Sequence, residues 1–234
     1  MNPFENKKAL VLGGTSGIGL AIVHRLNNAG CEVIAASRRG SADNLPHDVT
    51  VESLDVLDED SLKQFFSRHA PYDFLVNAAT GGARAKGPFL EMEMTGFQGS
   101  FAKLWGYTNC VRHGCAHLDE RGAIALISGS PARKCAPGMI AISCVGNAVE
   151  GFVRGVAPEI APRRINAVSP GLIDTPMFPQ EGDDRQAFFK QATAENVIPR
   201  AGTADEIAEG VMFVLSNQFV TGTVVDVDGG ILLP

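Results

Sequence analysis

Short apolar runs alternate with amphipathic stretches along the whole chain. The apolar runs have the length of buried strands, and the stretches between them carry apolar residues at helical spacing. This pattern predicts strands at Ala9–Leu12, Cys31–Ser37, Val49–Leu54, Tyr72–Asn77, Ala123–Ser128, Arg164–Val168 and Thr223–Val227. It predicts helices directly after Gly19 and at Asp58–His69, Thr95–Leu118, Met139–Glu159, Asp183–Glu195 and Ala204–Ser216.

Strands that alternate with helices need crossover connections, so their sheet must be parallel. We therefore expect an α/β fold: a single Rossmann-type, doubly wound parallel sheet of about seven strands, flanked by helices on both faces. No linker or repeat interrupts the pattern, which predicts one domain over residues 1–234. Ligands of such sheets lie beyond the carboxyl ends of the strands.

A glycine-rich turn, within LVLGGTSGIGL at Leu10–Leu20, joins the first strand to the first helix. In this arrangement backbone N–H groups and a helix N-terminus can bind a pyrophosphate. Glycine-rich turns also connect strands and helices that bind nothing, so the context decides. The predicted pyrophosphate site comprises Gly13, Thr15, Ser16, Gly17, Ile18 and Gly19.

Five segments in order match motifs of one family. They are Leu12–Gly19 (with Leu12 where a threonine is usual), Asp55-Val56, Asn77–Thr80, Asn166–Pro176 and Val227–Gly230. On these motifs the chain resembles the short-chain dehydrogenase/reductase family over essentially its whole length. The resemblance implies a dinucleotide site with Asp55 and Val56 at the adenine, Asn77, Ala78 and Ala79 near the adenosine ribose, and Pro170, Gly171, Ile173 and Thr175 at the nicotinamide.

The end of the second predicted strand selects the cofactor. NAD-binding proteins have a carboxylate there, whereas an arginine suits the 2′-phosphate of NADP. This chain has Ser37 followed by Arg38 and Arg39, and a guanidinium can bind a phosphate bidentately. The alternative is a pair of solvated arginines, but the pattern favours NADP(H) over NAD(H).

The proton-transfer residues of the family are missing from their usual places. The resemblance puts Ile142 at the position of the family's tyrosine and Gly146 at that of its lysine, and neither side chain can transfer a proton. The family's serine position falls on Gly129, between Ser128 and Ser130. We predict that Ser128 or Ser130 contributes to the catalytic site.

The family's asparagine position, in the central helix, falls on Lys103. Desolvation in a cleft would lower the pKa of this lysine toward the working range of a general acid. The alternative is a solvated or ion-paired helix lysine. Tyr107 shares its helix face, where core or interface packing is the favoured interpretation.

Other side chains suggest a substrate pocket. Arg133 and Lys134 follow the fifth strand and would either bind an anionic substrate or be merely exposed. Residues 176–200, with Phe188 and Phe189, occupy the place of the family's substrate-binding segment and predict an apolar lid.

Composition narrows the partners. The net charge is −6, without a basic cluster, so we expect no nucleic acid. No apolar run approaches membrane length, and the N-terminus lacks a signal-peptide core, so we expect no membrane and a cytoplasmic location. The five cysteines form no Cys-x-x-Cys pair, and we expect no metal, although Cys110, His113, Cys115 and His117 lie close in sequence. The resemblance implies a homodimer or homotetramer.

These features favour an NADP(H)-dependent oxidoreductase that transfers hydride to or from a small carbonyl or alcohol, with a non-standard proton donor. Because Ile142 and Gly146 replace the usual pair, a catalytically degenerate NADP(H)-binding sensor or partner subunit remains open. A non-redox isomerisation or dehydration is a third possibility. The sequence names neither the substrate nor the reaction direction.

Overall fold

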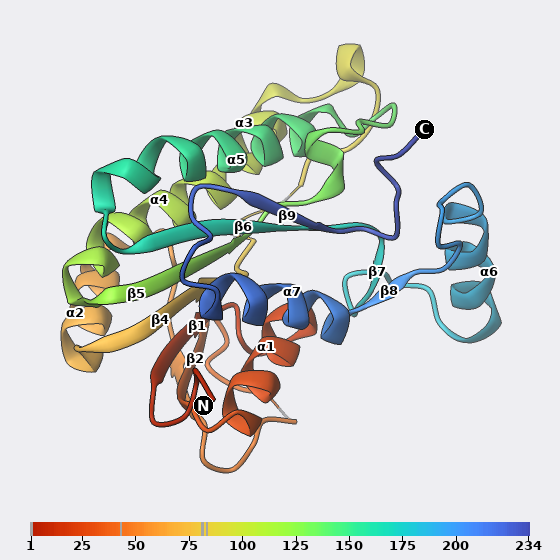
Figure 1. The fold of residues 1–234 in the computed structure, drawn as a ribbon. Coiled ribbons are helices and arrows are strands. Elements are labelled where there is room, and N and C mark those ends of the chain that lie inside the picture. Colours follow the sequence, from red (N-terminus) through yellow and green to blue (C-terminus); the bar gives the residue numbers. More distant parts are fainter. Residues whose placement is uncertain (1, 43, 81, 83) are drawn as a thin grey trace.

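A seven-stranded parallel sheet forms the centre of the protein (Figure 1). The computed structural model describes residues 2–42, 44–80, 82 and 84–234. The strand order is β3-β2-β1-β4-β5-β6-β9, which confirms the Rossmann-like α/β fold. The strands are β1 (Lys8–Leu12), β2 (Glu32–Ser37), β3 (Thr50–Ser53), β4 (Tyr72–Asn77), β5 (Leu118–Ile127), β6 (Arg164–Pro170) and β9 (Val224–Val227).

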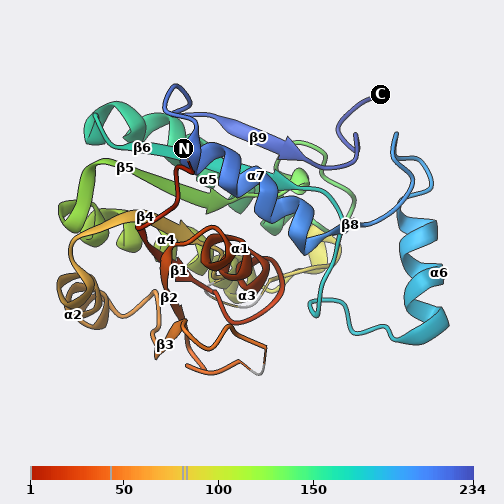
Figure 2. The same ribbon diagram turned by 60° about the horizontal axis from the view of Figure 1, so that its bottom comes forward.

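Helices cover both faces of the sheet (Figures 1 and 2). On one face α1 (Gly17–Asn28) packs beside α7 (Ala204–Ser216). On the other lie α2 (Glu59–His69), α4 (Ala102–Gly114) and α5 (Ile140–Ile160). Strand residues alternate between the two faces, so Ala9 and Val11 join one hydrophobic core and Leu10 and Leu12 join the other.

The predicted helix Thr95–Leu118 is wrong in its continuity. The segment contains α3 (Met94–Ser100), α4 and the short 3-10 helix η2 (Cys115–His117), and Leu118 already belongs to β5. At the break the Ser100 hydroxyl donates to the carbonyl of Gly96 at 3.0 Å and accepts from the Ala85 N–H at 2.9 Å. These bonds connect the loop before α3 to the end of that helix. The spacing of apolar residues along a helix cannot predict such a contact.

Further elements lie at the carboxyl ends of the strands. The pair β7 (Ile173–Asp174) and β8 (Gly202–Thr203) forms a small separate sheet. Between them α6 (Gly182–Ala192) stands away from the main body (Figures 1 and 2). Two 3-10 helices, η1 (Phe89–Glu91) and η3 (Ser130–Ala132), complete the elements.

The expectation that no apolar stretch approaches membrane length is wrong for α5. Among the described residues it is the one helix that is long and apolar enough, by length and composition, to cross a membrane. Its residues Val145, Val149 and Val153 are buried in the protein. Packing within the fold therefore accounts for the apolar residues on its buried side.

Candidate active site

The glycine-rich turn lies at the carboxyl end of β1, where α1 begins. The N-cap residue, Ser16, is extended and makes no side-chain capping bond. The first N–H groups of α1 thus keep their capacity to bind an anion. Gly17 has a φ of +52°, and a Cβ placed on it would point toward Thr175, 3.6 Å from the Thr175 Cβ. The turn after β1 and the segment after β6 therefore face each other.

Two of the motif glycines also serve the turn's own packing. A Cβ on Gly19 would lie 2.0 Å from the carbonyl oxygen of Gly13, and one on Gly13 would lie 2.7 Å from the amide nitrogen of Ala79. No larger residue fits at either position without moving the backbone. Their close approach to a pyrophosphate stays a prediction, as does contact from Thr15 and Ile18.

The end of β2 presents two arginines. The Ser37 carbonyl accepts from the Leu54 N–H at 3.0 Å and from the Gly40 N–H at 3.1 Å, which shapes a tight turn. Arg38 and Arg39 are exposed on this turn, and neither forms an ion pair within the described residues. Their guanidinium groups are therefore available to a phosphate.

The predicted adenine and ribose residues follow β3 and β4. Asp55 accepts from the Leu57 N–H at 3.0 Å, and Val56 is buried. Asn77 accepts from the Ala79 N–H at 3.0 Å, while the Ala78 N–H donates to the Leu12 carbonyl at 2.8 Å. The ends of β1 and β4 are thereby fixed side by side.

The predicted nicotinamide segment leaves β6. The Gly171 N–H donates to the Val227 carbonyl at 3.1 Å, just beyond Pro170 at the end of β6. Ile173 and Thr175 are both buried.

Unsatisfied polar groups at these strand ends test whether a dinucleotide fits. Within the described residues, the Asn77 amide nitrogen and the Ser169 hydroxyl are buried without a hydrogen-bond partner. Buried polar atoms without partners are uncommon in proteins, and both atoms lie at carboxyl ends of sheet strands, on β4 and β6, which flank β5. Together with the N–H groups at the start of α1, they fit a nicotinamide dinucleotide.

Lys103 is directed from α4 to the end of β5. Its Nζ donates to the Ser128 carbonyl at 3.2 Å and lies 5.5 Å from the centre of the Tyr107 ring. Desolvation, together with the positive charge of Arg84, lowers the pKa of Lys103 from 10.5 to about 7. Such an amine exchanges protons near neutral pH, which a solvated lysine does not.

The two candidate serines differ in their contacts. The Ser128 hydroxyl donates to Glu150 Oε1 at 3.2 Å, so it points toward α5, whereas its carbonyl faces Lys103. Ser130 is buried at the start of η3, and its carbonyl accepts from the Arg133 N–H at 3.0 Å. The hydrogen bonds therefore link only the backbone of Ser128 to Lys103.

Tyr107 is buried, and its hydroxyl donates to the Ile127 carbonyl at 3.0 Å. Burial raises the pKa of this phenol. Core packing, the favoured interpretation from sequence, agrees with these contacts.

The position of the family's lysine is closed by packing. A Cβ on Gly146 would lie 2.8 Å from the Ala132 Cβ. Ile142 is half-buried one turn earlier on α5. A longer side chain at Gly146 would require η3 to move.

The chain matches known proteins over nearly its whole length. The family model described as Enoyl-(Acyl carrier protein) reductase matches residues 13–232. A solved structure described as a short chain dehydrogenase/reductase family protein is 30% identical and has a TM-score of 0.86. The match covers 99% of this chain and 100% of the solved chain. The chain belongs to the short-chain dehydrogenase/reductase family.

Two further relatives indicate the chemistry of the family. Carbonyl reductase family member 4 of Danio rerio is 30% identical over 97% of this chain and 99% of its own. A small-chain dehydrogenase solved in complex with NADPH is 32% identical, with a TM-score of 0.87 over 98% of this chain and 100% of its own. The protein is accordingly an oxidoreductase of this family and uses a nicotinamide cofactor and a small-molecule substrate.

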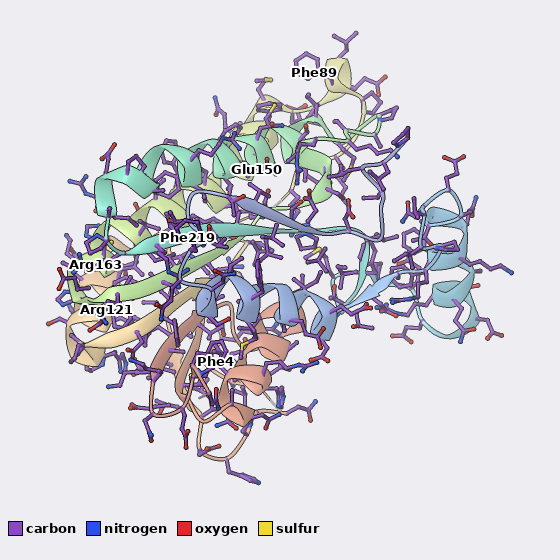
Figure 3. The ribbon with its side chains drawn as sticks, viewed as in Figure 1. Phe4, Phe89, Arg121, Glu150, Arg163 and Phe219 are labelled. Carbon is purple, nitrogen blue, oxygen red and sulfur yellow. The ribbon has the colours of Figure 1, made fainter. Side chains whose placement is uncertain are left out.

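Arg133 and Lys134 are exposed and also contact the protein itself, which favours the second of their two alternatives, exposure without binding of an anionic substrate. Arg133 pairs with Asp226 of β9, and its Nε lies 3.3 Å from Glu150 Oε1. Glu150 is a buried residue of α5 and is labelled in Figure 3. Lys134 donates to the Ile231 carbonyl at 2.6 Å. Both therefore fix the loop after β5 to the C-terminal part of the chain.

Sequence reasoning missed Arg84. It lies in the loop after β4, of which residues 81 and 83 are outside the described residues, and its Nη1 is 3.1 Å from Met177 Sδ. Its positive charge adds to desolvation in lowering the pKa of Lys103. Its loop packs on α4, since a Cβ on Gly82 would lie 3.0 Å from the Ala102 Cβ. No spacing rule links positions 84 and 103, and only the excess of basic residues after β4 could have drawn attention to Arg84.

The segment that carries α6 contains an aromatic cluster. The ring centres of Phe178, Phe188 and Phe189 lie 5.3–5.5 Å apart. Beside them a hollow of about 440 Å³ is lined by Asp174, Thr175, Pro176, Phe178, Pro179, Gln180, Glu181 and Arg185. This hollow adjoins Thr175 and hence the predicted nicotinamide segment.

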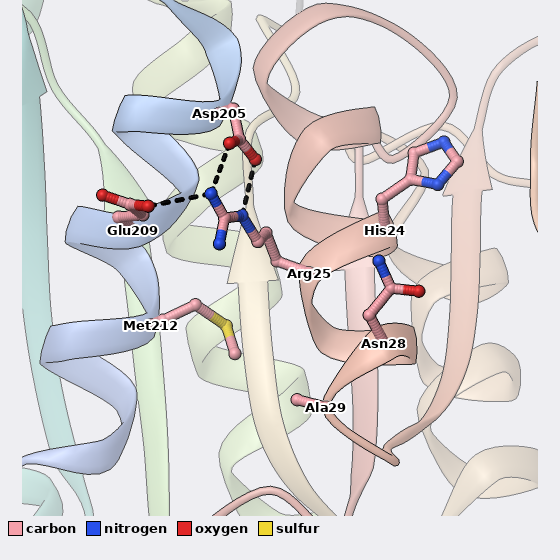
Figure 4. A pocket seen from close by; sticks show the side chains of 7 residues that line it. All are labelled: His24, Arg25, Asn28, Ala29, Asp205, Glu209 and Met212. Carbon is pink, nitrogen blue, oxygen red and sulfur yellow. Dashed lines mark hydrogen bonds and ion pairs between the residues drawn. The ribbon is translucent and has the colours of Figure 1, made fainter.

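A second groove has a structural explanation. It lies between α1 and α7, has a volume of about 610 Å³, and contains Arg25 paired with Asp205 and Glu209 (Figure 4). These helices cover the sheet face opposite α4 and Lys103. The groove therefore lies apart from the candidate proton donor.

No metal cluster is found in the part of the chain that the structure describes. His113 Nε2 lies 2.9 Å from Glu59 Oε2, and Cys110 is fully buried. The four neighbouring Cys and His residues thus have separate environments.

Proposed function

We propose that the protein is an NADP(H)-dependent oxidoreductase for a small carbonyl or alcohol, with Lys103 as its proton donor. The proximity of Lys103 to the end of β5, with a pKa near 7, is the observation that carries this proposal. The fit of the strand ends to a nicotinamide dinucleotide supports it. When bound, the cofactor supplies or accepts the hydride.

Lys103 would act on the oxygen of the substrate. In the direction of reduction, its ammonium gives a proton to the carbonyl oxygen as that oxygen gains negative charge. In the direction of oxidation, the neutral amine takes the hydroxyl proton. The Ser128 carbonyl positions the amine, and Ser130 lies on the same loop.

The site would be atypical for the family, since Ile142 and Gly146 occupy the positions matched to its tyrosine and lysine. The contact expected between a side chain at Gly146 and Ala132 supports this assignment, because it leaves no room for a lysine. The same observation favours the second candidate, a degenerate NADP(H)-binding sensor or partner subunit.

Arg38 and Arg39 would select NADP(H). We expect clearly tighter binding of NADPH than of NADH, followed through nucleotide fluorescence and energy transfer from Trp105, the single tryptophan. Arg38→Gln or Arg39→Gln should weaken NADPH binding about 10- to 100-fold, because a charge-assisted bond to the 2′-phosphate is lost, and leave NADH unaffected. The control is Lys63→Gln, which removes an exposed positive charge on α2, away from the predicted phosphate site. Equal affinity for the two nucleotides would overturn the preference.

Turnover separates the two candidate functions. Carbonyl-dependent oxidation of NADPH by the wild type, lost in Lys103→Ala with binding intact, would support the enzyme. NADPH binding without turnover of any carbonyl tested would favour the sensor. Residues 176–200 would form the lid of the same site. The family resemblance favours a homodimer or homotetramer, and the free cysteines are typical of a cytoplasmic location.

A further inference from the structure

Two cations lie together in the candidate site without a carboxylate. Among the described residues neither Lys103 nor Arg84 forms an ion pair, whereas Arg133 and Arg185 do. The loop that carries Arg84 packs directly on α4: a Cβ on Gly82 would lie 3.0 Å from the Ala102 Cβ. The loop is also held by the bond from Ala85 to Ser100.

The present partner of Arg84 is a poor one. Its Nη1 faces the thioether of Met177, which is a weak hydrogen-bond acceptor. Arg84 is exposed, so a substrate can reach its guanidinium, although partial desolvation lowers its pKa. A guanidinium with its donors unused is a natural binding group for a carboxylate, which it can hold bidentately.

We infer that Arg84 binds an anionic group of the substrate, of the carboxylate class, beside the carbonyl that Lys103 serves. This inference rests on the proposed function and adds a substrate class to it: small oxo acids and the corresponding hydroxy acids. Arg133, Lys134 and Arg185 already have protein partners, so they do not compete for that anion.

The anion would couple binding to proton transfer. A carboxylate on Arg84 removes the positive field that now acts on Lys103 and favours its ammonium form. Arg84 and Tyr107 are the titratable groups that face this amine among the described residues. The reaction then balances: hydride adds to the carbonyl carbon, the Lys103 ammonium gives its proton to the oxygen, and the hydroxy acid leaves with a neutral amine behind.

The test is calorimetric titration of the NADP⁺-saturated protein, which cannot reduce a ketone, with 4-oxopentanoate and, in parallel, with its neutral methyl ester. We expect the acid to bind at least 10-fold more tightly than the ester. Arg84→Gln should remove this preference while the affinity for the ester stays within about twofold. The matched control is Lys86→Gln, an exposed cation two residues along the same loop, which should keep the preference.

Proton uptake gives a second readout. At about pH 8, where Lys103 is mostly neutral, binding of the acid should take up a fraction of a proton, measured from titrations in buffers of different ionisation enthalpy. Lys103→Met should abolish the uptake, and the ester should cause none.

Three outcomes would overturn the inference: equal affinity for acid and ester, an acid preference that survives Arg84→Gln, or a loss of NADPH affinity in Arg84→Gln that accounts for the effect. The last would assign Arg84 to the cofactor phosphates. Because the readout is binding, Arg84-dependent preference without turnover would retain the carboxylate site and reject the reductase. Turnover of neutral ketones without an acid preference would retain the reductase and reject the carboxylate site.

Discussion

At the scale of single residues, Lys103 governs the expected pH dependence. With a pKa of about 7, its ammonium is depleted as the pH rises through 7. We expect kcat/KM for carbonyl reduction to fall about 10-fold per pH unit above this pKa. The kcat/KM for alcohol oxidation should rise as the pH increases through this pKa, because the neutral amine is then the form that accepts the proton. Stopped-flow or steady-state absorbance of NADPH between about pH 5.5 and 9 measures both profiles.

Variants at the same residue separate acid catalysis from charge. Lys103→Ala should lower kcat at least about 100-fold, since general acid catalysis contributes that much or more. Lys103→Arg keeps the charge but cannot release a proton in this pH range, so its profile should lose the transition near 7. A wild-type profile that is flat from 6 to 9 would remove Lys103 from the mechanism.

A second residue-scale prediction concerns Gly146. Alanine is a better helix former than glycine by about 1 kcal/mol, yet a Cβ here would lie 2.8 Å from the Ala132 Cβ. We expect Gly146→Ala to lower the free energy of unfolding by about 1–2 kcal/mol through overpacking, measured by urea denaturation. Gly151→Ala is the matched control on the same helix, because a Cβ there meets nothing within 4 Å, and it should be neutral or stabilising.

A double-mutant cycle with Ala132→Gly isolates the contact. If the clash is the cause, the combined variant should lose less stability than the sum of the two single changes. Strict additivity would place the cost of Gly146→Ala elsewhere.

At the scale of elements, Arg185 anchors α6 to the segment before it. Its guanidinium pairs with Asp174 and donates to the carbonyls of Phe178 at 2.8 Å, Gln180 at 2.9 Å and Thr175 at 2.8 Å. Arg185→Met should leave these acceptors unsatisfied and loosen residues 174–192. We expect faster amide hydrogen exchange there, with α1 and α7 unchanged, and a several-fold lower kcat/KM if the segment is a lid. Lys190→Met, exposed on the same helix, is the control, and unaltered exchange in Arg185→Met would contradict the anchoring role.

The bounds of the elements show which parts of the fold the hydrophobic periodicity can predict. Tyr72–Asn77 and Ala204–Ser216 have the predicted bounds, because an apolar run or an amphipathic face spans each element from end to end. The pattern predicts one helix over Thr95–Leu118 because helical spacing within the stretch gives no sign of the hydrogen bond between Ser100 and Ala85, which lies outside it. The pair β7 and β8 was missed because two residues per strand are too few for a period.

At the scale of the whole molecule, the buried amine should make stability depend on pH. Lys103 has its pKa lowered from 10.5 to about 7 in the folded state, so between these values the unfolded chain binds more protons than the folded one. The free energy of unfolding contributed by this group therefore rises with pH across the window. Lys103→Met should stabilise the protein by about 1–2 kcal/mol near pH 6.5, a value reduced because residue 103 is only half-buried and solvent screens its charge. The stabilisation should be smaller near pH 9, because the penalty for losing the proton on folding shrinks as the pH approaches the unfolded pKa.

Comparison of the two proteins in urea at each pH isolates this effect. Burial raises the pKa of the Cys31, Cys110 and Cys115 thiols, but these cysteines are present in both proteins, so their contributions cancel in the difference. A difference in unfolding free energy that does not change with pH would show that Lys103 titrates as a solvated lysine.

The sequence by itself determined the α/β fold, the place of the glycine-rich turn and the family, because these depend on local periodicity and on motifs with fixed spacing. It also singled out Lys103, from its position in the matched central helix. Whether that lysine lies in a desolvated site depends on the Ser128 carbonyl and on Arg84, which are distant in sequence.

Only the tertiary structure assigned Arg133 and Lys134 to internal contacts and packed the loop of Arg84 on α4, the helix that carries Lys103. A charge in the sequence does not carry the identity of its partner, because ion pairs form between elements that the folded sheet brings together. The sequence thus specified which chemical groups the strand ends carry, and the packing of loops and helices around them decided which groups remain available to a substrate.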